Sequence, residues 1–271
     1  MTPNKQILNA TELWHLNAEA LHDQSYLDQY TAALTFLIRD TKLHILDTAC
    51  GSGFPTTSLY QLGFTNIEAS DADADSVAKL SRYFQNLNLP IPVSEGMWQE
   101  LSNKIDRKFD VILNTDNSLV YMDGWSENGS VASGFENISQ RISLVLKNFY
   151  DLLNPNGFVI IGLGKHYDPI ASDDYWKNSS HRIFHATENE QAVQIEWKIK
   201  TDWQETRHLN WTITAEGNEV TGITEKKAYL ITKNELADMM HKIGFSTVHI
   251  LDPDGTRDNL IVGMKSNRFK L

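Results

Sequence analysis

The part of the chain best suited to chemistry is residues 43–56, where an apolar run ends in Asp47 and leads into Gly51-Ser52-Gly53. This pattern predicts a buried strand, a sharp turn and the N-terminus of a helix, whose free N–H groups face a crevice. The glycines allow a positive φ and let the backbone approach a ligand closely. A dinucleotide fingerprint needs a third glycine at position 56, where this chain has Thr56, so a pyrophosphate site is disfavoured.

A second candidate is Asp71, which follows a strand predicted over residues 66–70 and stands 18 residues after the second glycine of the turn. At about this distance, α/β nucleotide sites place a carboxylate on the ribose hydroxyls. A carboxylate can accept both hydrogen bonds of a cis-diol. Asp73 and Asp75 are alternatives, but their position favours capping the helix predicted over residues 76–87.

Two loops that follow predicted strands carry further candidates. The strand at residues 91–94 leads to Met97 and Trp98, whose apolar and aromatic surfaces suit the wall of a ligand pocket. The strand at residues 109–113 is followed by the polar run 114–118, at the sheet edge where α/β folds place ligands. Both loops are therefore expected beside the glycine turn.

The hydrophobic pattern alternates between helical and strand-like periods, which predicts an α/β fold with helices on both faces of a mostly parallel sheet. One or two helices are expected over residues 11–39, and further helices after the glycine turn up to Gly63 and over 76–87, 138–153 and 236–243. Strands are expected over 43–47, 66–70, 91–94, 109–113, 158–161, 247–251 and 259–264. Residues 193–224 alternate apolar and polar side chains, which predicts two or three antiparallel strands inserted as a cap after the strand at 158–161. The expected domains are an N-terminal helical segment (1–42), a sheet domain (43–164 and 228–271) and the cap (165–227).

The composition narrows the class of protein. The chain has 271 residues, 41% of them hydrophobic, which suits one α/β domain with an elaboration. A net charge of −11 argues against a nucleic-acid partner, because such binding depends on Lys and Arg at phosphates. No apolar run is long enough to span a membrane, and the N-terminus lacks a signal-peptide pattern. Because nucleic acid is disfavoured, a small-molecule partner is expected. The single cysteine fits a reducing compartment, so the protein is expected in the cytoplasm.

Metal and nucleophile chemistry are not expected. His181 and His185 have the spacing of one helix face, but no Glu follows His181, and zinc needs at least three protein ligands. Cys50 lies in the glycine turn, away from any His partner that would activate a thiol.

The segment Ile-Leu-Asp-Thr-Ala-Cys-Gly-Ser-Gly at residues 45–53 resembles motif I of the class I S-adenosylmethionine-dependent methyltransferases. Gly63-Phe64 and Asp71 follow at that family's distances, and Trp98 falls where the family has a tryptophan on the adenine. Within the family, the chain is similar to glycine N-methyltransferase and related small-amine N-methyltransferases over roughly residues 26–168. The resemblance implies a Rossmann-like sheet of seven strands with an antiparallel last strand, S-adenosylmethionine as the cofactor and S-adenosylhomocysteine as the product.

The resemblance also implies site residues. Those expected at the cofactor are Tyr30, Asp47, Ala49, Gly51, Gly53, Asp71, Ala72, Met97, Trp98, Thr115, Asn117 and Ser118. Those expected at the methyl acceptor are Asn117, Tyr121, Lys165 and Tyr167.

Three positions depart from the family. Lys165 stands where glycine N-methyltransferase has the arginine that clamps the carboxylate of glycine, Tyr121 replaces a histidine, and Tyr26 replaces an arginine near Tyr30. Lysine lacks the bidentate geometry of arginine, so glycine is not the expected acceptor. The prediction for Lys165 is that it holds some other anionic group of the substrate.

The reaction that the resemblance implies is methyl transfer to the nitrogen of a small amine or amino acid, by in-line displacement in a closed cavity. One alternative is an O-methyltransferase acting on a small hydroxylated metabolite. A non-catalytic S-adenosylmethionine-binding module is another, and a third is an NAD-binding oxidoreductase, which the missing third glycine disfavours. The sequence leaves open the acceptor, the choice between nitrogen and oxygen, and the oligomeric state. A homo-oligomer is compatible with the sequence.

Overall fold

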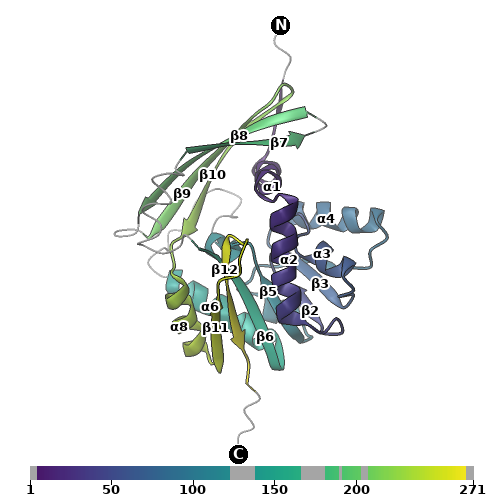
Figure 1. Ribbon diagram of the computed structural model, residues 1–271, viewed down its shortest axis with the longest axis vertical. Helices are drawn as coiled ribbons and strands as arrows, with labels where there is room; N and C mark the ends of the chain where they lie inside the picture. Colours follow the sequence, from purple (N-terminus) through teal and green to yellow (C-terminus); the bar gives the residue numbers. More distant parts are fainter. Residues whose placement is uncertain (1–4, 123–137, 166–180, 189–190, 203–206, 267–271) are drawn as a thin grey trace, which may run out of the picture.

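The computed structural model describes residues 5–122, 138–165, 181–188, 191–202 and 207–266, with the backbone alone for 181–188 and 191. It contains a seven-stranded sheet flanked by helices and a separate five-stranded sheet (Figure 1). Helix α1 (Ala10–Leu21) lies between the two sheets. We call the five-stranded sheet the cap sheet.

The seven-stranded sheet has the strand order β11-β12-β6-β5-β2-β3-β4. The β2–β3, β2–β5, β3–β4 and β5–β6 pairs are parallel, whereas β12 is antiparallel to both β6 and β11. The predicted Rossmann-like sheet with an antiparallel last strand is therefore confirmed. Its strands are β2 (Ile45–Asp47), β3 (Ile67–Asp71), β4 (Val93–Glu95), β5 (Phe109–Asn114), β6 (Leu153–Gly164), β11 (Thr247–Leu251) and β12 (Asp258–Met264).

Helices cover both faces of this sheet and enclose two apolar cores. Ile45 packs into one core and its neighbour Leu46 into the other, because successive side chains of a strand point to opposite faces. The core that holds Ile45 receives α2 (Gln24–Ile38), α3 (Thr56–Gln61) and α4 (Ala74–Asn86). The core that holds Leu46 receives α5 (Leu101–Lys104), α6 (Ile138–Leu152) and α8 (Lys233–Ile243).

Some element boundaries differ from those predicted. Asp73 is the N-cap of α4 and accepts a hydrogen bond from the Ser76 N–H, so the helix begins at Ala74 rather than at residue 76. Strand β6 begins at Leu153 rather than at residue 158. The predicted capping box between Thr232 and Glu235 is confirmed at the start of α8.

The cap sheet has the order β1-β10-β9-β8-β7. Its strands are β1 (Gln6–Ile7), β7 (His181–Glu188), β8 (Gln191–Asp202), β9 (His208–Glu216) and β10 (Val220–Tyr229). Residues 193–224 fall in three consecutive antiparallel strands, β8, β9 and β10, as predicted. Strand β7, which precedes that range, adds antiparallel to β8, and β1 adds in parallel beside β10. His181 and His185 lie on a strand, not on a helix.

Two kinds of feature are absent from the part of the chain that the structure describes. No group of three or more His, Cys, Asp or Glu side chains that could hold a metal ion occurs in this part of the chain. Over the same residues, no helix has the length and apolar character needed to cross a bilayer.

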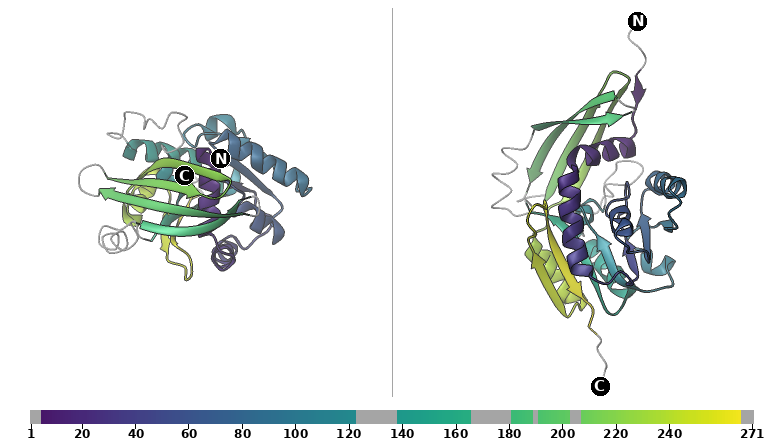
Figure 2. Two further views of the ribbon diagram at one scale, coloured as in Figure 1. Left: turned by 90° about the horizontal axis from the view of Figure 1, so that it is seen from above. Right: turned by 45° about the vertical axis from the view of Figure 1, so that its right-hand side comes forward.

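Helix α1 connects the cap sheet to the seven-stranded sheet (Figure 2). On one side, Leu13 packs so closely on β10 that a Cβ at Gly222 would lie 3.0 Å from its side chain. On the other side, the Thr11 hydroxyl donates to Asp73 (3.2 Å) and His15 hydrogen-bonds to Ser76 (3.2 Å) at the start of α4. The helix therefore covers the sheet edge at which β3 ends.

Candidate functional site

A cavity lies between α1 and the carboxyl ends of β2, β3 and β5, the edge at which open α/β sheets bind ligands. Its empty volume is about 880 Å³, with open solvent at the mouth included. The described residues that line it are Trp14, His15, Ala18, His22, Ala49, Cys50, Gly51, Ser52, Phe54, Asp71, Ala72, Ser76, Met97, Trp98, Gln99, Asp116, Ser118, Tyr121 and Met122.

The glycine turn after β2 borders the middle of the cavity. Gly51 has a φ of +44° and donates its N–H to Asp71 Oδ2 (2.9 Å). Gly53 has a φ of +110°, and a Cβ there would lie 2.8 Å from Leu80 Cδ1. Positive φ and close packing both require glycine, so the turn keeps its backbone open to a ligand.

Asp47 supports this turn from below and does not line the cavity. It is fully buried, and its carboxylate accepts hydrogen bonds from the Ala49 N–H (3.2 Å) and the Thr56 hydroxyl (2.7 Å). Burial raises the pKa of Asp47 to about 7, against the effect of these two hydrogen bonds. Thr56, at the position of the missing third glycine, is therefore a structural partner of Asp47.

Asp71 ends β3 and lines the cavity. Its Oδ2 accepts from the Gly51 N–H and its Oδ1 from the Asp73 N–H (3.0 Å). Burial raises the pKa of Asp71, while the backbone N–H groups act in the opposite direction. Each carboxylate oxygen keeps a further lone pair, which is what two adjacent hydroxyls require.

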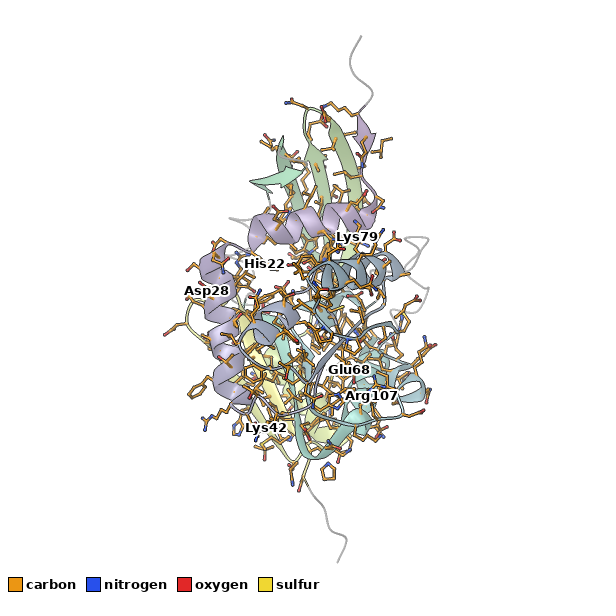
Figure 3. The ribbon with its side chains drawn as sticks, turned by 90° about the vertical axis from the view of Figure 1, so that its right-hand side faces the viewer. His22, Asp28, Lys42, Glu68, Lys79 and Arg107 are labelled. Carbon is orange, nitrogen blue, oxygen red and sulfur yellow. The ribbon has the colours of Figure 1, made fainter. Side chains whose placement is uncertain are left out.

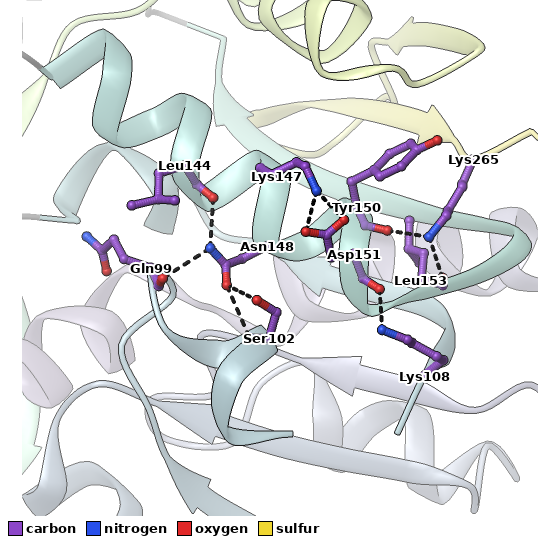
Figure 4. Close-up of polar contacts among 10 residues, drawn as sticks. All are labelled: Gln99, Ser102, Lys108, Leu144, Lys147, Asn148, Tyr150, Asp151, Leu153 and Lys265. Carbon is purple, nitrogen blue, oxygen red and sulfur yellow. Dashed lines mark hydrogen bonds and ion pairs between the residues drawn. The ribbon is translucent and has the colours of Figure 1, made fainter. Parts of the chain in front are cut away.

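The loop after β4 forms one wall of the cavity through Met97, Trp98 and Gln99. The Trp98 indole N–H donates to the Thr48 carbonyl, which fixes the ring. Asn148 of α6 holds the loop from behind by donating to the Gln99 carbonyl (3.0 Å) and accepting at Oδ1 from the Ser102 N–H (3.1 Å) (Figure 4). This wall offers a flat aromatic surface with polar groups at its edge.

The loop after β5 turns sharply at Asp116 (φ +53°) and Asn117 (φ +57°), two consecutive residues in the left-handed region. Asp and Asn tolerate this conformation better than other non-glycine residues. The turn places Asp116 and Ser118 in the lining, while Asn117 points away and accepts the Gly164 N–H at Oδ1 (3.0 Å). Thr115 is buried behind the cavity.

Aromatic side chains wall the cavity on the side of the cap sheet. Trp14 of α1 meets Tyr121 edge to face, with ring centroids 5.0 Å apart. Trp211 of β9 packs behind both, at 6.4 Å from Trp14 and 6.2 Å from Tyr121. Such a wall suits an apolar or cationic group of a ligand.

The structure separates the predicted site residues into two groups. Eight of them line the cavity: Ala49, Gly51, Asp71, Ala72, Met97, Trp98, Ser118 and Tyr121. Five lie behind the lining and support it: Tyr30, Asp47, Gly53, Thr115 and Asn117. Tyr30, for example, is fully buried and holds the loop after β5 by accepting the Asp116 N–H at its hydroxyl (3.2 Å).

Lys165, which was predicted at the acceptor, is not among the lining residues. The Lys165 ammonium contacts Asp252 (2.5 Å) and the Pro253 carbonyl (2.7 Å), both in the loop after β11. These contacts give no support to its predicted role in holding an anionic group. Tyr167 lies outside the described residues.

Several lining residues were missed by the sequence interpretation, most importantly Trp14, His15, His22 and Asp116. Asp116 lies within the polar run that was predicted to face a ligand, so position relative to β5 could have identified it. The other three lie on or just after α1, where a helical pattern alone does not say which residues face a ligand.

No family model matches the chain. A glycine/sarcosine N-methyltransferase from Halorhodospira halochloris is 27% identical over 157 residues, which are 56% of this chain and 52% of that protein. The match therefore spans about half the length of that curated relative.

Solved structures match over nearly the whole chain. A S-adenosylmethionine-dependent methyltransferase from Clostridium acetobutylicum has a TM-score of 0.64 at 17% identity, covering 94% of this chain and 98% of that one. An amino pentose methyltransferase from Micromonospora echinaspora, with S-adenosylmethionine bound, has a TM-score of 0.67 at 12% identity, covering 96% and 99%. The resemblance first seen in the glycine turn is thus confirmed, and the chain has the fold of the class I S-adenosylmethionine-dependent methyltransferases.

Proposed function

We propose that this protein is an S-adenosylmethionine-dependent methyltransferase that methylates the nitrogen of a small amine. The observation that carries the proposal is the order of groups along the cavity: the Trp98 wall, the Asp71 carboxylate and the open backbone of the glycine turn lie side by side at neighbouring strand ends. An aromatic ring, a sugar diol and an extended tail are the parts of S-adenosylmethionine that need these three surfaces in this order.

The residues present fit that cofactor. Trp98 and Met97 offer apolar surface to the adenine, and Asp71 can accept hydrogen bonds from both ribose hydroxyls. Gly51, with a φ of +44° and no Cβ, leaves backbone open toward the cavity, where the methionine part of the cofactor can lie against it. When bound, S-adenosylmethionine supplies the methyl group, and its sulfonium makes that group electrophilic.

The protein's part in the reaction is alignment. Trp14, Tyr121 and Met122 wall the cavity toward the cap sheet, where an acceptor can approach over the glycine turn. Holding two reactants in line can lower a barrier by about 7–11 kcal/mol. Cys50 also lines the cavity, but burial raises the pKa of its thiol, which keeps it neutral and unreactive.

Nitrogen is favoured over oxygen as the acceptor because the sequence relative is named as a glycine/sarcosine N-methyltransferase. One structural neighbour is named as an amino pentose methyltransferase. Both names describe small amines, which agrees with the size of the cavity. An O-methyltransferase on a small hydroxylated metabolite is the competing proposal, and methylation assays with paired amine and alcohol acceptors separate the two.

Titration calorimetry with S-adenosylhomocysteine tests the cofactor. The wild-type protein is expected to bind it, and Asp71→Ala to lose about 1.5–3 kcal/mol of binding free energy, the value of hydrogen bonds to a charged group. The matched control is Asp75→Ala, which removes an exposed carboxylate from the same acidic run and is expected to leave the affinity unchanged. Binding of NADH in place of S-adenosylhomocysteine would contradict the proposal.

A further inference from the structure

The end of the cavity beyond the glycine turn holds a charged pair, His22 and Asp116, that the proposed reaction does not use. Asp71, the glycine turn and Asp116 follow β3, β2 and β5, which are neighbours in the sheet. Neighbouring strands lie about 4.8 Å apart, so about 10 Å separates the strand that carries Asp71 from the strand that precedes Asp116. A cofactor with its ribose at Asp71 therefore extends its amino-acid end toward Asp116.

At this end, His22 and Asp116 form an ion pair that lines the cavity. The Nε2 atom of His22 lies 3.1 Å from Asp116 Oδ1, which also accepts the Tyr26 hydroxyl (3.2 Å). Both hydrogen bonds use Oδ1. Among the described residues, neither Asp116 Oδ2 nor His22 Nδ1 makes a hydrogen bond, and 39% of the Asp116 side chain is exposed.

Buried groups hold the pair in place. His22 follows α1, where Figure 3 labels it, and its ring stacks on Tyr26 with centroids 5.1 Å apart. The Tyr30 hydroxyl donates to Asp258 Oδ2 (3.0 Å) and accepts the Asp116 N–H, which fixes the left-handed turn at Asp116. A binding group whose geometry is fixed beforehand loses little entropy when a ligand arrives.

We propose that His22 and Asp116 bind the amino-acid end of S-adenosylmethionine, His22 through the carboxylate and Asp116 through the ammonium group. The inference rests on the proposed function and adds to it the residues that recognise the zwitterionic tail. A cation and an anion fixed side by side are complementary to a zwitterion, because each charge of the ligand meets the opposite charge of the protein.

The charges around His22 agree with this role. Burial disfavours the charged imidazole, but the Asp116 carboxylate outweighs burial and raises the pKa of His22. Asp258 acts in the same direction and Arg257, which lies over the Tyr26 ring at 4.6 Å, acts in the opposite one. Because a carboxylate ligand binds the protonated form, affinity for the tail should fall as the pH rises through the pKa of His22.

Two ligands that differ only in the tail test the inference. S-adenosylhomocysteine carries the amino-acid end, whereas 5′-methylthioadenosine keeps the adenine and ribose and lacks it. In calorimetric titrations, His22→Gln and Asp116→Asn are each expected to weaken the binding of S-adenosylhomocysteine by about tenfold to a hundredfold. The same substitutions are expected to weaken the binding of 5′-methylthioadenosine by less than about twofold. The fall in S-adenosylhomocysteine affinity with rising pH should be smaller in His22→Gln than in the wild type.

The matched control is His15→Gln, which alters a second histidine of the cavity beside Ser76, at the nucleoside end. Its effect should be the same for both ligands. The inference is overturned if His22→Gln and Asp116→Asn weaken the binding of both ligands equally. It is also overturned if both binding affinities stay unchanged and only the KM of the acceptor rises. Absence of any S-adenosylhomocysteine binding by the wild type would instead overturn the proposed function itself.

Discussion

Replacing Gly162 with alanine is expected to lower the free energy of unfolding by about 3 kcal/mol, at the upper end of what overpacking costs. Gly162 lies in β6, and a Cβ there would stand 2.5 Å from the Tyr30 hydroxyl, 2.7 Å from Asp258 Oδ2 and 2.9 Å from the Asp116 N–H. These atoms belong to one hydrogen-bonded group, so they cannot move apart separately. Urea denaturation followed by circular dichroism measures the loss.

A double-mutant cycle identifies the clash. Tyr30→Phe removes the hydroxyl that lies nearest to the added methyl group and is itself destabilising, because it leaves the Asp116 N–H without its partner. Combined with Gly162→Ala, its cost should be less than the sum of the two single costs, since the worst contact is already gone. Strictly additive costs would show that the methyl group is accommodated elsewhere and that the contact with Tyr30 is not the cause.

The part of the cavity around the glycine turn could be predicted from the sequence because its signals are local. Only Ser52 separates Gly51 from Gly53, and Asp71 follows one helix and one strand later. Each of these positions is set by a single strand end, so counting residues along the chain was sufficient to place them. Trp98 was found in the same way, after the next strand.

The other part of the cavity depends on packing between distant segments. His22 and Asp116 are 94 residues apart, and they meet because α1 is held over the sheet edge by contacts with both sheets. No periodicity in the sequence predicts that the two segments meet. Lys165 shows the converse. It stands where the resembled family has an arginine at the substrate, but its ammonium group contacts Asp252 and the Pro253 carbonyl from the loop after β11.

The buried carboxyl group of Asp47 is expected to make the free energy of unfolding depend strongly on pH. Burial raises its pKa to about 7 in the folded protein, compared with the ordinary value of 3.8. Between these two values the folded chain holds a proton that the unfolded chain has lost, so stability falls as the pH rises across this window and is level above it. A difference of about three pKa units corresponds to about 4 kcal/mol.

Asp47→Asn is the variant that isolates this effect, because asparagine has nearly the same shape and stays neutral at every pH. Its free energy of unfolding, minus that of the wild type, should rise by up to about 4 kcal/mol between pH 4 and pH 7.5. Asp258, whose pKa burial also raises to about 7, is present in both proteins, so its contribution cancels in the difference. Parallel pH profiles for the two proteins would mean that Asp47 ionises at the same pH in the folded and unfolded chains, and that the glycine turn rests on a carboxylate that is already charged.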